Sequence, residues 1–135
     1  MIDMPEEIKK SLKILVVDDE AQVLEVLQSL LDTEGYSTKG AVSGEAALEA
    51  LCSFLPHIVF LDIKMPGMDG IECLKKMREM KPDTVVVMIS GLATLDMAKE
   101  SLEFGAFDYI EKPFNFEHIR EVVRQVSITH FMDII

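Results

Sequence analysis

The stretch from Ile58 to Gly70 constrains the fold of this chain most strongly. It reads Ile-Val-Phe-Leu-Asp-Ile-Lys-Met-Pro-Gly-Met-Asp-Gly. Its first four residues are apolar and uncharged, which is typical of a strand buried on both faces of a parallel sheet. The strand ends on a single carboxylate, Asp62, and the Pro66-Gly67 pair forces a turn soon afterwards. Asp62 is therefore predicted at the carboxyl end of a central strand, which is the edge where open α/β sheets bind ligands.

The rest of the chain alternates strand and helix patterns around this stretch. Strands are predicted at residues 13–17, 36–42, 84–89 and 107–110, and helices at 21–34, 43–54, 71–81, 94–104 and from 115 onward. Five βα units with short connections form a parallel sheet with helices on both faces, because crossover connections are right-handed. We therefore predict an α/β, (βα)5 doubly wound fold with a five-stranded parallel sheet.

Length and charge restrict the classes of protein that this chain can belong to. Its 135 residues are enough for one domain with a real core. The net charge of −11 argues against direct binding of nucleic acid or an anionic membrane by this segment. No apolar run reaches the roughly 18–20 residues that span a bilayer, and the acidic start is unlike a signal peptide. We therefore expect a cytoplasmic protein.

The ends of the chain differ in character from its middle. Residues 1–11 are a polar lead-in, residues 12–128 hold the predicted domain, and residues 129–135 form an apolar tail. The tail is typical of a linker to a missing output domain or of a segment that packs on a partner. A frayed terminus without a role is the third interpretation.

Polar groups follow four of the five predicted strands. Asp18 and Asp19 follow the first strand, Asp62 ends the third, Ser90 follows the fourth and Lys112 follows the fifth. Carboxylates that converge at one edge repel each other by roughly 4 kcal/mol per pair at about 4 Å. Either some of them stay protonated or a cation neutralises them, and Mg²⁺ suits such an all-oxygen environment.

This arrangement is suited to phosphoryl transfer. The reaction requires stabilisation of the charge on the transferred oxygens. Lys112 can supply a positive charge to one oxygen, and Ser90 can supply a hydroxyl donor to another. Asp62 would then be the nucleophile and would form an aspartyl phosphate.

Taken together, these motifs resemble the receiver domain of two-component response regulators. They are Asp18-Asp19, Asp62 with Met65-Pro66-Gly67, Ser90-Gly91 and Lys112-Pro113-Phe114. The resemblance covers residues 12–128 and implies the flavodoxin-like strand order 2-1-3-4-5. It also implies that the Lys112–Pro113 peptide bond is cis.

The resemblance assigns roles to individual residues. It implies that Asp62 accepts a phosphoryl group from a histidine kinase or phosphotransfer protein, and that Ser90 and Lys112 hold the phosphoryl oxygens. Mg²⁺ would be bound by Asp18, Asp19, Asp62 and the backbone carbonyl of Lys64. Ser90 and Tyr109 would act as the switch residues that carry the change to an output domain or partner.

The resemblance also suggests a homodimer. Many relatives pair through the fourth helix, fifth strand and fifth helix of the domain. In this chain that surface is expected to include Glu100, Glu103, Arg120 and Arg124. The chain would catalyse only its own phosphorylation and dephosphorylation, and would not be an enzyme with a separate substrate.

Three other functions are compatible with parts of the pattern. A receiver-like interaction module that works without phosphorylation is the main alternative. A Mg²⁺-dependent phosphohydrolase with Asp62 as nucleophile would need a second acidic residue where Lys64 stands, and a cap insertion that is missing. A flavin carrier is disfavoured because Asp18, Asp19 and Glu20 would repel the flavin phosphate.

Overall fold

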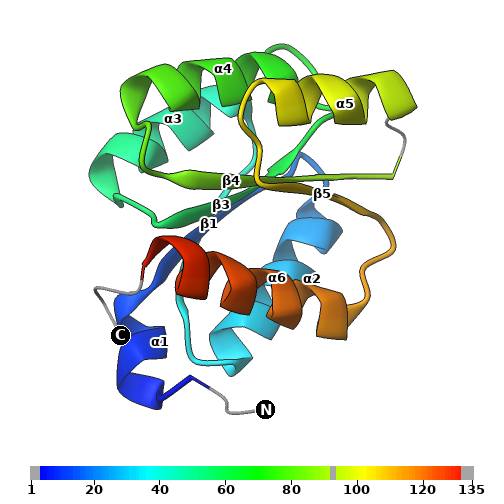
Figure 1. Ribbon diagram of the computed structural model, residues 1–135. Coiled ribbons are helices and arrows are strands. Elements are labelled where there is room, and N and C mark those ends of the chain that lie inside the picture. Colours follow the sequence, from blue (N-terminus) through cyan, green and yellow to red (C-terminus); the bar gives the residue numbers. More distant parts are fainter. Residues whose placement is uncertain (1–3, 92–93, 132–135) are drawn as a thin grey trace.

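The computed structural model describes residues 4–91 and 94–131 and has three layers (Figure 1). The middle layer is a five-stranded parallel sheet with the order β2-β1-β3-β4-β5. Its strands are β1 (Lys13–Val17), β2 (Ser37–Ala41), β3 (Ile58–Asp62), β4 (Val85–Ser90) and β5 (Asp108–Glu111). The predicted doubly wound α/β fold and its strand order are thus confirmed.

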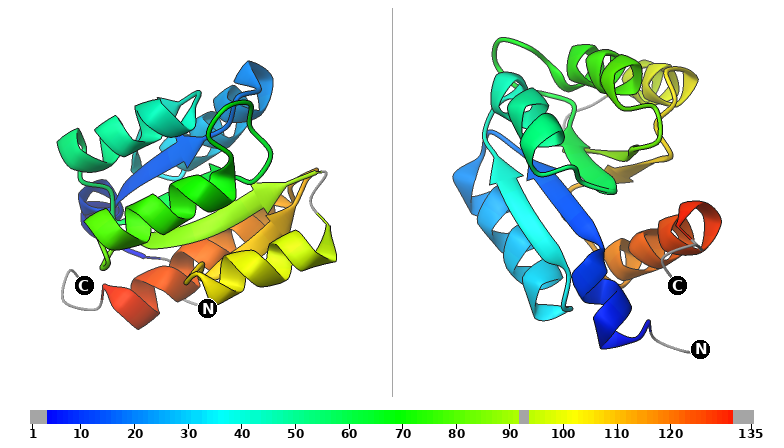
Figure 2. Two further views of the ribbon diagram at one scale, coloured as in Figure 1. Left: turned by 90° about the horizontal axis from the view of Figure 1, so that it is seen from above. Right: turned by 90° about the vertical axis from the view of Figure 1, so that its left-hand side faces the viewer.

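Helices cover both faces of this sheet. One face carries α3 (Gly44–Ser53), α4 (Gly70–Met80) and α5 (Leu95–Glu103), whereas the other carries α2 (Ala21–Thr33) and α6 (Phe116–His130) (Figures 1 and 2). Short polar side chains begin several of these helices, as the sequence predicts. The Ser43 side chain accepts a hydrogen bond from the N–H of Ala46, and Asn115 caps the start of α6.

Strand β3 lies at the centre of the sheet, between β1 and β4, and all five of its residues are buried. Alternate side chains point to opposite faces of the strand. Val59 and Leu61 pack into the core beneath α3 and α4, whereas Ile58 and Phe60 pack into the core beneath α2 and α6. Two cores therefore hold β3 in place, and Asp62 at its end has a fixed position.

The structure adds one helix to the elements that the sequence predicts. Helix α1 (Glu6–Ser11) lies within the polar lead-in and follows Pro5, which provides no side-chain cap. Ile8 packs against the core beneath α2 and α6, and the Lys9 ammonium lies 5.9 Å from the centre of the Tyr36 ring. Tertiary contacts stabilise this six-residue helix, which is too short to be stable alone.

The last helix is longer than its apolar pattern suggests. Helix α6 continues to His130, so it includes the first two residues of the segment interpreted as an apolar tail. Phe131 follows the helix and packs edge-on against His57, with ring centres 5.2 Å apart. Residues 132–135 of that segment lie outside the described residues.

Gly70 provides a test of how closely α4 approaches the end of β3. A Cβ atom at Gly70 would overlap the carbonyl oxygen of Asp62 and lie 2.6 Å from the Cα of Ile63. We predict that Gly70→Ala lowers the free energy of unfolding by about 1–3 kcal/mol, the usual cost of overpacking. Helix propensity alone predicts the opposite sign.

Urea denaturation of the purified variant measures this difference. Gly91→Ala is the matched control, because a Cβ atom there would meet the Lys112 side chain at an ordinary 3.5 Å. Equal stability of the two variants would contradict the close approach of α4 to β3.

Candidate functional site

The carboxyl ends of four neighbouring strands meet at one edge of the sheet. Asp18 follows β1, Asp62 ends β3, Ser90 ends β4 and Lys112 follows β5. Asp18, Asp62 and Ser90 are almost fully buried, with exposed fractions of 0%, 2% and 1%. The structure therefore brings together four of the residues that the sequence predicts for the site.

The Lys112 side chain is the centre of the charge pairing at this edge. Its Nζ lies 2.7 Å from Oδ2 of Asp18, 3.4 Å from Oδ2 of Asp62 and 3.5 Å from Oε1 of Glu20. Burial alone would lower the pKa of Lys112, but the contact with Asp18 and the negative charges nearby outweigh it and raise this pKa. Lys112 therefore stays positively charged in the site.

Asp62 is a weaker acid than an ordinary aspartate. Burial and, to a smaller extent, the negative charge of Asp18 raise the pKa of Asp62 to about 6. Lys112 and the backbone N–H of Lys64 act in the opposite direction, and this N–H donates to Oδ1 of Asp62 over 3.3 Å. The Asp62 carboxylate is thus mostly ionised at neutral pH, but at a cost in folding free energy.

Three carboxylates are close enough to share a cation. One oxygen from each of Asp18, Glu20 and Asp62 lies within 4.8 Å of the others. The Glu20 N–H donates to Oδ1 of Asp18 over 2.8 Å, whereas the buried Oδ2 is ion-paired with the Lys112 ammonium over 2.7 Å. An all-oxygen set in which three carboxylates face a single ammonium fits a hard divalent ion.

The carboxylates that lie together in the structure are in part different from those that the sequence predicts. Asp19 is exposed and does not belong to the group within the described residues, whereas Glu20, which the sequence analysis did not assign to a metal site, does. Its place directly after Asp18 and Asp19 was the only signal in the sequence. The roles predicted for Asp19 and for the Lys64 carbonyl stay predictions.

Tyr109, one of the two predicted switch residues, lies on the edge strand β5. This strand pairs with β4, which ends at Ser90. Tyr109 is half-buried, is paired in register with Met88 of β4 and packs against the core beneath α3 and α4. Burial raises the pKa of its hydroxyl, with a further contribution from Glu111. The strand leads into the Lys112–Pro113 peptide bond, which is cis as the family resemblance implies.

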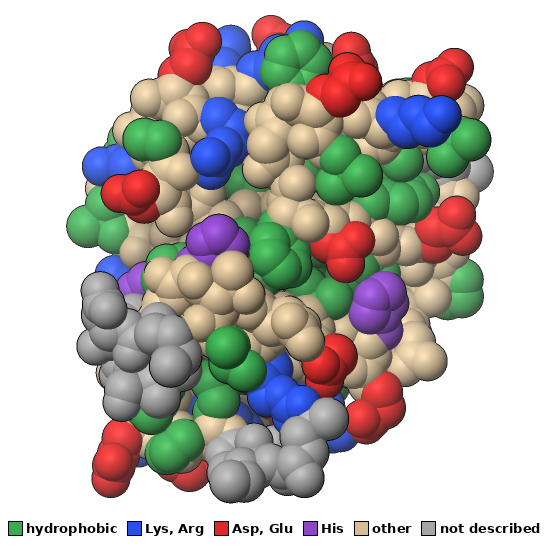
Figure 3. Space-filling model, viewed as in Figure 1, with side chains coloured by type: hydrophobic (Ala, Val, Ile, Leu, Met, Phe, Trp, Pro, Cys, Tyr) green, Lys and Arg blue, Asp and Glu red, His purple; other side chains and the backbone are tan. Residues whose placement is uncertain are grey.

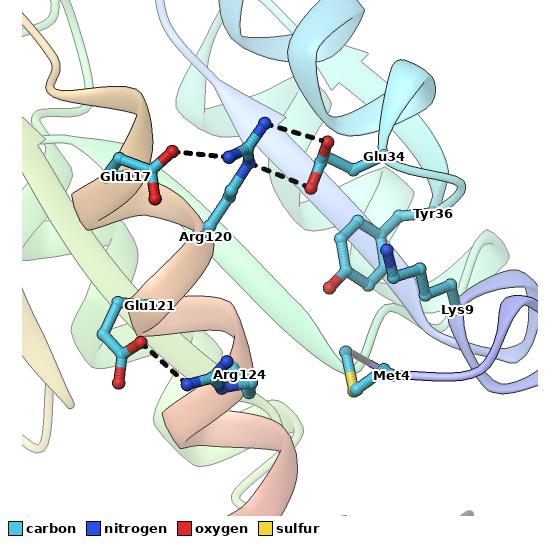
Figure 4. Close-up of a pocket in the computed structure, with 8 residues that line it drawn as sticks. All are labelled: Met4, Lys9, Glu34, Tyr36, Glu117, Arg120, Glu121 and Arg124. Atoms are coloured by element: carbon cyan, nitrogen blue, oxygen red, sulfur yellow. Dashed lines mark hydrogen bonds and ion pairs between the residues drawn. The ribbon is translucent and has the colours of Figure 1, made fainter. Parts of the chain in front are cut away.

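Two of the residues expected on a dimer surface, Arg120 and Arg124, lie on α6 and form ion pairs within the chain. Arg120 forms ion pairs with Glu34, next to the end of α2, and with Glu117 (Figure 4). Together with Arg124 it lines a hollow of about 260 Å³ beside Lys9 and Tyr36. The two arginines therefore face α1 and α2. The predicted dimer is not tested by this finding.

The comparisons with known proteins agree with the fold. Residues 14–124 match the response regulator receiver domain family. Sporulation initiation phosphotransferase F of Bacillus subtilis is 40% identical over 113 residues, which are 84% of this chain and 91% of that protein. Regulatory protein AtoC of Escherichia coli is 38% identical over 84% of this chain, which covers 24% of AtoC.

Solved structures of related proteins are also similar to this chain in sequence and fold. The receiver domain of NtrX from Brucella abortus is 36% identical, with a TM-score of 0.82 over 86% of this chain and 98% of that chain. The chemotaxis protein CheY4 of Vibrio cholerae is 26% identical, with a TM-score of 0.80 over 85% of this chain and 98% of that chain.

The fold is that of a receiver domain. This chain belongs to the receiver domain family of two-component response regulators. It spans about a quarter of AtoC and of several other curated regulators that it matches. Within the described residues, none of the helices combines the length and the hydropathy needed to cross a membrane.

The raised pKa of Asp62 makes the stability of the domain depend on pH. The folded protein binds a proton at Asp62 more tightly than the unfolded chain does, so stability is lost as the pH rises from about 4 to about 6. We predict that Asp62→Asn raises the free energy of unfolding by about 1–2 kcal/mol at pH 7.5, because a neutral amide replaces a buried carboxylate. The gain disappears near pH 4.

Urea denaturation at both pH values, with a chelator present, measures this effect. Asp83→Asn is the control, because Asp83 is exposed in the turn before β4. A gain of equal size at both pH values would contradict the assignment of the effect to Asp62 ionisation.

Proposed function

We propose that this chain is a phosphorylation-dependent switch that accepts a phosphoryl group on Asp62. The donor is the phosphohistidine of a sensor histidine kinase or of a phosphotransfer protein. The observation that carries the proposal is the pairing of Lys112 with buried Asp62 and buried Asp18. Modification then controls an output domain or a partner protein.

The chemistry is an in-line transfer between two nucleophiles. An oxygen of ionised Asp62 forms a bond to phosphorus while the bond from phosphorus to the donor imidazole nitrogen breaks. The electron pair of the broken bond stays on that nitrogen. The Lys112 ammonium and the Ser90 hydroxyl would stabilise the transferred oxygens. Water later hydrolyses the acyl phosphate, so the chain acts on no separate substrate.

A Mg²⁺ ion would neutralise the carboxylates and the incoming phosphoryl group when bound. Asp18, Asp19, Asp62 and the backbone carbonyl of Lys64 would hold it. The Asp62 ionisation near pH 6 leaves the nucleophile mostly deprotonated at neutral pH. This chain's own residues therefore supply the nucleophile, the positive charge and the hydroxyl donor.

The change in shape would begin at Ser90 and Tyr109. Ser90 would move toward the phosphoryl oxygens, and the half-buried Tyr109 ring would turn inward into the space vacated. Such a pair is a two-state element that a local charge can bias. The exposed apolar residues Leu95 and Leu102 of α5, and Phe104 directly after it, lie where the altered surface would contact a partner or a second copy. Figure 3 shows hydrophobic side chains over this helix.

The donor would dock in a groove next to the site. Glu20 and Lys112 line one end of a mostly apolar hollow of about 570 Å³, formed between the start of α2 and the loop before α6. Its walls include Val26 and Phe116, which are 50% and 48% exposed. A donor helix seated there would place its phosphohistidine beside Lys112, because the groove is continuous with the site.

Incubation with acetyl phosphate tests the chemistry directly. We predict that intact mass spectrometry finds one phosphoryl group on the wild-type chain with Mg²⁺, and none in Asp62→Asn or with a chelator. Lys112→Met should slow the reaction on the order of a hundredfold, the usual cost of removing a charge-stabilising group. Asp83→Asn should react as the wild type does.

The result that would overturn the proposal is an unmodified Asp62 under all of these conditions. The chain would then be a receiver-like interaction module that works without phosphorylation. A modification at another residue would contradict the site assignment.

Substitutions in the groove distinguish docking of the donor protein from the phosphoryl transfer itself. We predict that Phe116→Ser and Val26→Ser slow transfer from a phosphorylated histidine kinase about tenfold or more, since exposed apolar anchors carry much of the energy of an interface. Their rates with acetyl phosphate should not change. Ile128→Ser, which alters an equally exposed residue at the far end of α6, is the control. Equal loss with both donors would argue against docking in this groove.

A further inference from the structure

The hollow between α1, α2 and α6 contains a lysine that is not paired with a negative charge. Lys9 is only 8% exposed, so it is more than nine-tenths buried. Its ammonium lies 5.9 Å from the centre of the Tyr36 ring but forms no ion pair or hydrogen bond with any residue that the structure describes. A buried charge without a partner is costly to the folded state. An anion in the hollow would therefore stabilise this position.

A carboxylate that lines the hollow together with Lys9 already has a partner. Oε1 of Glu34 lies 3.0 Å from Nε of Arg120, and Oε2 of Glu34 accepts a hydrogen bond from Nη2 of Arg120 over 3.4 Å. Figure 4 shows these two contacts, and it shows Lys9 across the hollow from the arginines, beside the Tyr36 ring. Because Arg120 engages both oxygens of Glu34, the positive charge of Lys9 stays unbalanced.

Arg124 supplies a second positive group to the hollow. Its side chain is 19% exposed, and its Nη2 donates to Oε2 of Glu121 on the same helix over 3.2 Å. A guanidinium has five N–H donors, and this contact uses one of them. Arg124 extends from α6 and Lys9 from α1, on opposite sides of the hollow (Figure 4). An anion between them would be held by two helices that are far apart in the chain.

The size and the walls of the hollow restrict the kind of anion that fits. Its volume of about 260 Å³ is below the roughly 300–1,000 Å³ that is typical of pockets for drug-sized ligands. Met4 and the Tyr36 ring add apolar surface to its lining. One carboxylate balances the single unpaired ammonium, whereas a phosphate dianion would bring a second negative charge close to Glu34 and Glu121.

We propose that this hollow binds a small organic carboxylate, whose oxygens contact Lys9 and Arg124 and whose apolar part packs against Tyr36. Lys9 precedes β1 and Tyr36 precedes β2, so the hollow lies at the amino ends of these strands, away from the edge that holds Asp62. Lys9 also lies outside the residues that match the receiver family. The site is therefore separate from the phosphoryl-transfer chemistry and does not depend on the proposed function.

Titration of the full chain with benzoate, followed by heteronuclear NMR without added metal, tests this proposal. We expect saturable shifts of the backbone amides of Lys9, Tyr36 and Arg124, with a dissociation constant of about 1 mM, as is usual for a ligand of few atoms. Lys9→Met keeps an apolar side chain but removes the charge, and should weaken binding on the order of tenfold. Lys10→Met removes the same charge from the exposed neighbouring residue and should bind as the wild type does.

A second variant and a second ligand separate charge recognition from packing. Arg124→Gln leaves α1 unaltered and should also weaken benzoate binding several-fold, because it removes the other cation. Benzamide has the shape of benzoate without its charge, and it should bind on the order of tenfold more weakly. The amide spectrum of each variant without ligand shows whether α1 and the rest of the fold are retained.

Several results would overturn the proposal. Equal affinity of Lys9→Met and Lys10→Met would show that the Lys9 ammonium does not bind the ligand. Equal binding of benzoate and benzamide would show that charge plays no part. Tighter binding of inorganic phosphate than of benzoate would contradict the assignment of a carboxylate. Benzoate shifts confined to the surroundings of Lys112 would place the ligand in the other site.

Discussion

The ion pairing of Lys112 with two buried carboxylates is the interaction on which the site depends. Asp18 and Asp62 lie where water cannot solvate their charge, and a buried charge is tolerated only when it is paired. Lys112 comes from the end of β5, so one ammonium connects the ends of three strands that are far apart in sequence. The pairing is incomplete, because negative charges outnumber the single positive charge. Burial and, to a smaller extent, this excess of negative charge raise the pKa of Asp62.

Much of the fold could be predicted because its central strands are buried on both faces. A run such as residues 58–61 has no polar side to present to water, so it fits only the interior of a parallel sheet. The same reasoning located Asp62 and Ser90, since the first polar residue after a buried run marks the end of the strand, and Lys112 stands two residues after the last predicted strand. The structure confirms that these three residues meet at one edge. Parallel strands leave no other arrangement once their order is known.

The features that could not be predicted from the sequence depend on contacts between segments that are far apart in the chain. Glu20 lies in an acidic run where nothing local distinguishes it from Asp19, and only the packed structure shows which side chain reaches Lys112. Helix α1 is stabilised by contacts with Tyr36 and the core instead of by its own pattern. Arg120 has the spacing of an outward-facing residue on α6, but Glu34 at the end of another helix determines where its side chain lies.

The position of β3 between two neighbours has a consequence for local opening of the protein. Amide groups of a central strand exchange with solvent only when the sheet around them opens, whereas edge strands open at a lower free energy. Asp62 is on a central strand, since it is paired with Ile89 and lies on a fully buried strand. Lys112 follows β5, which is an edge strand. Local opening at β5 would therefore move Lys112 away from the site at a lower cost in free energy than opening at β3 would move Asp62.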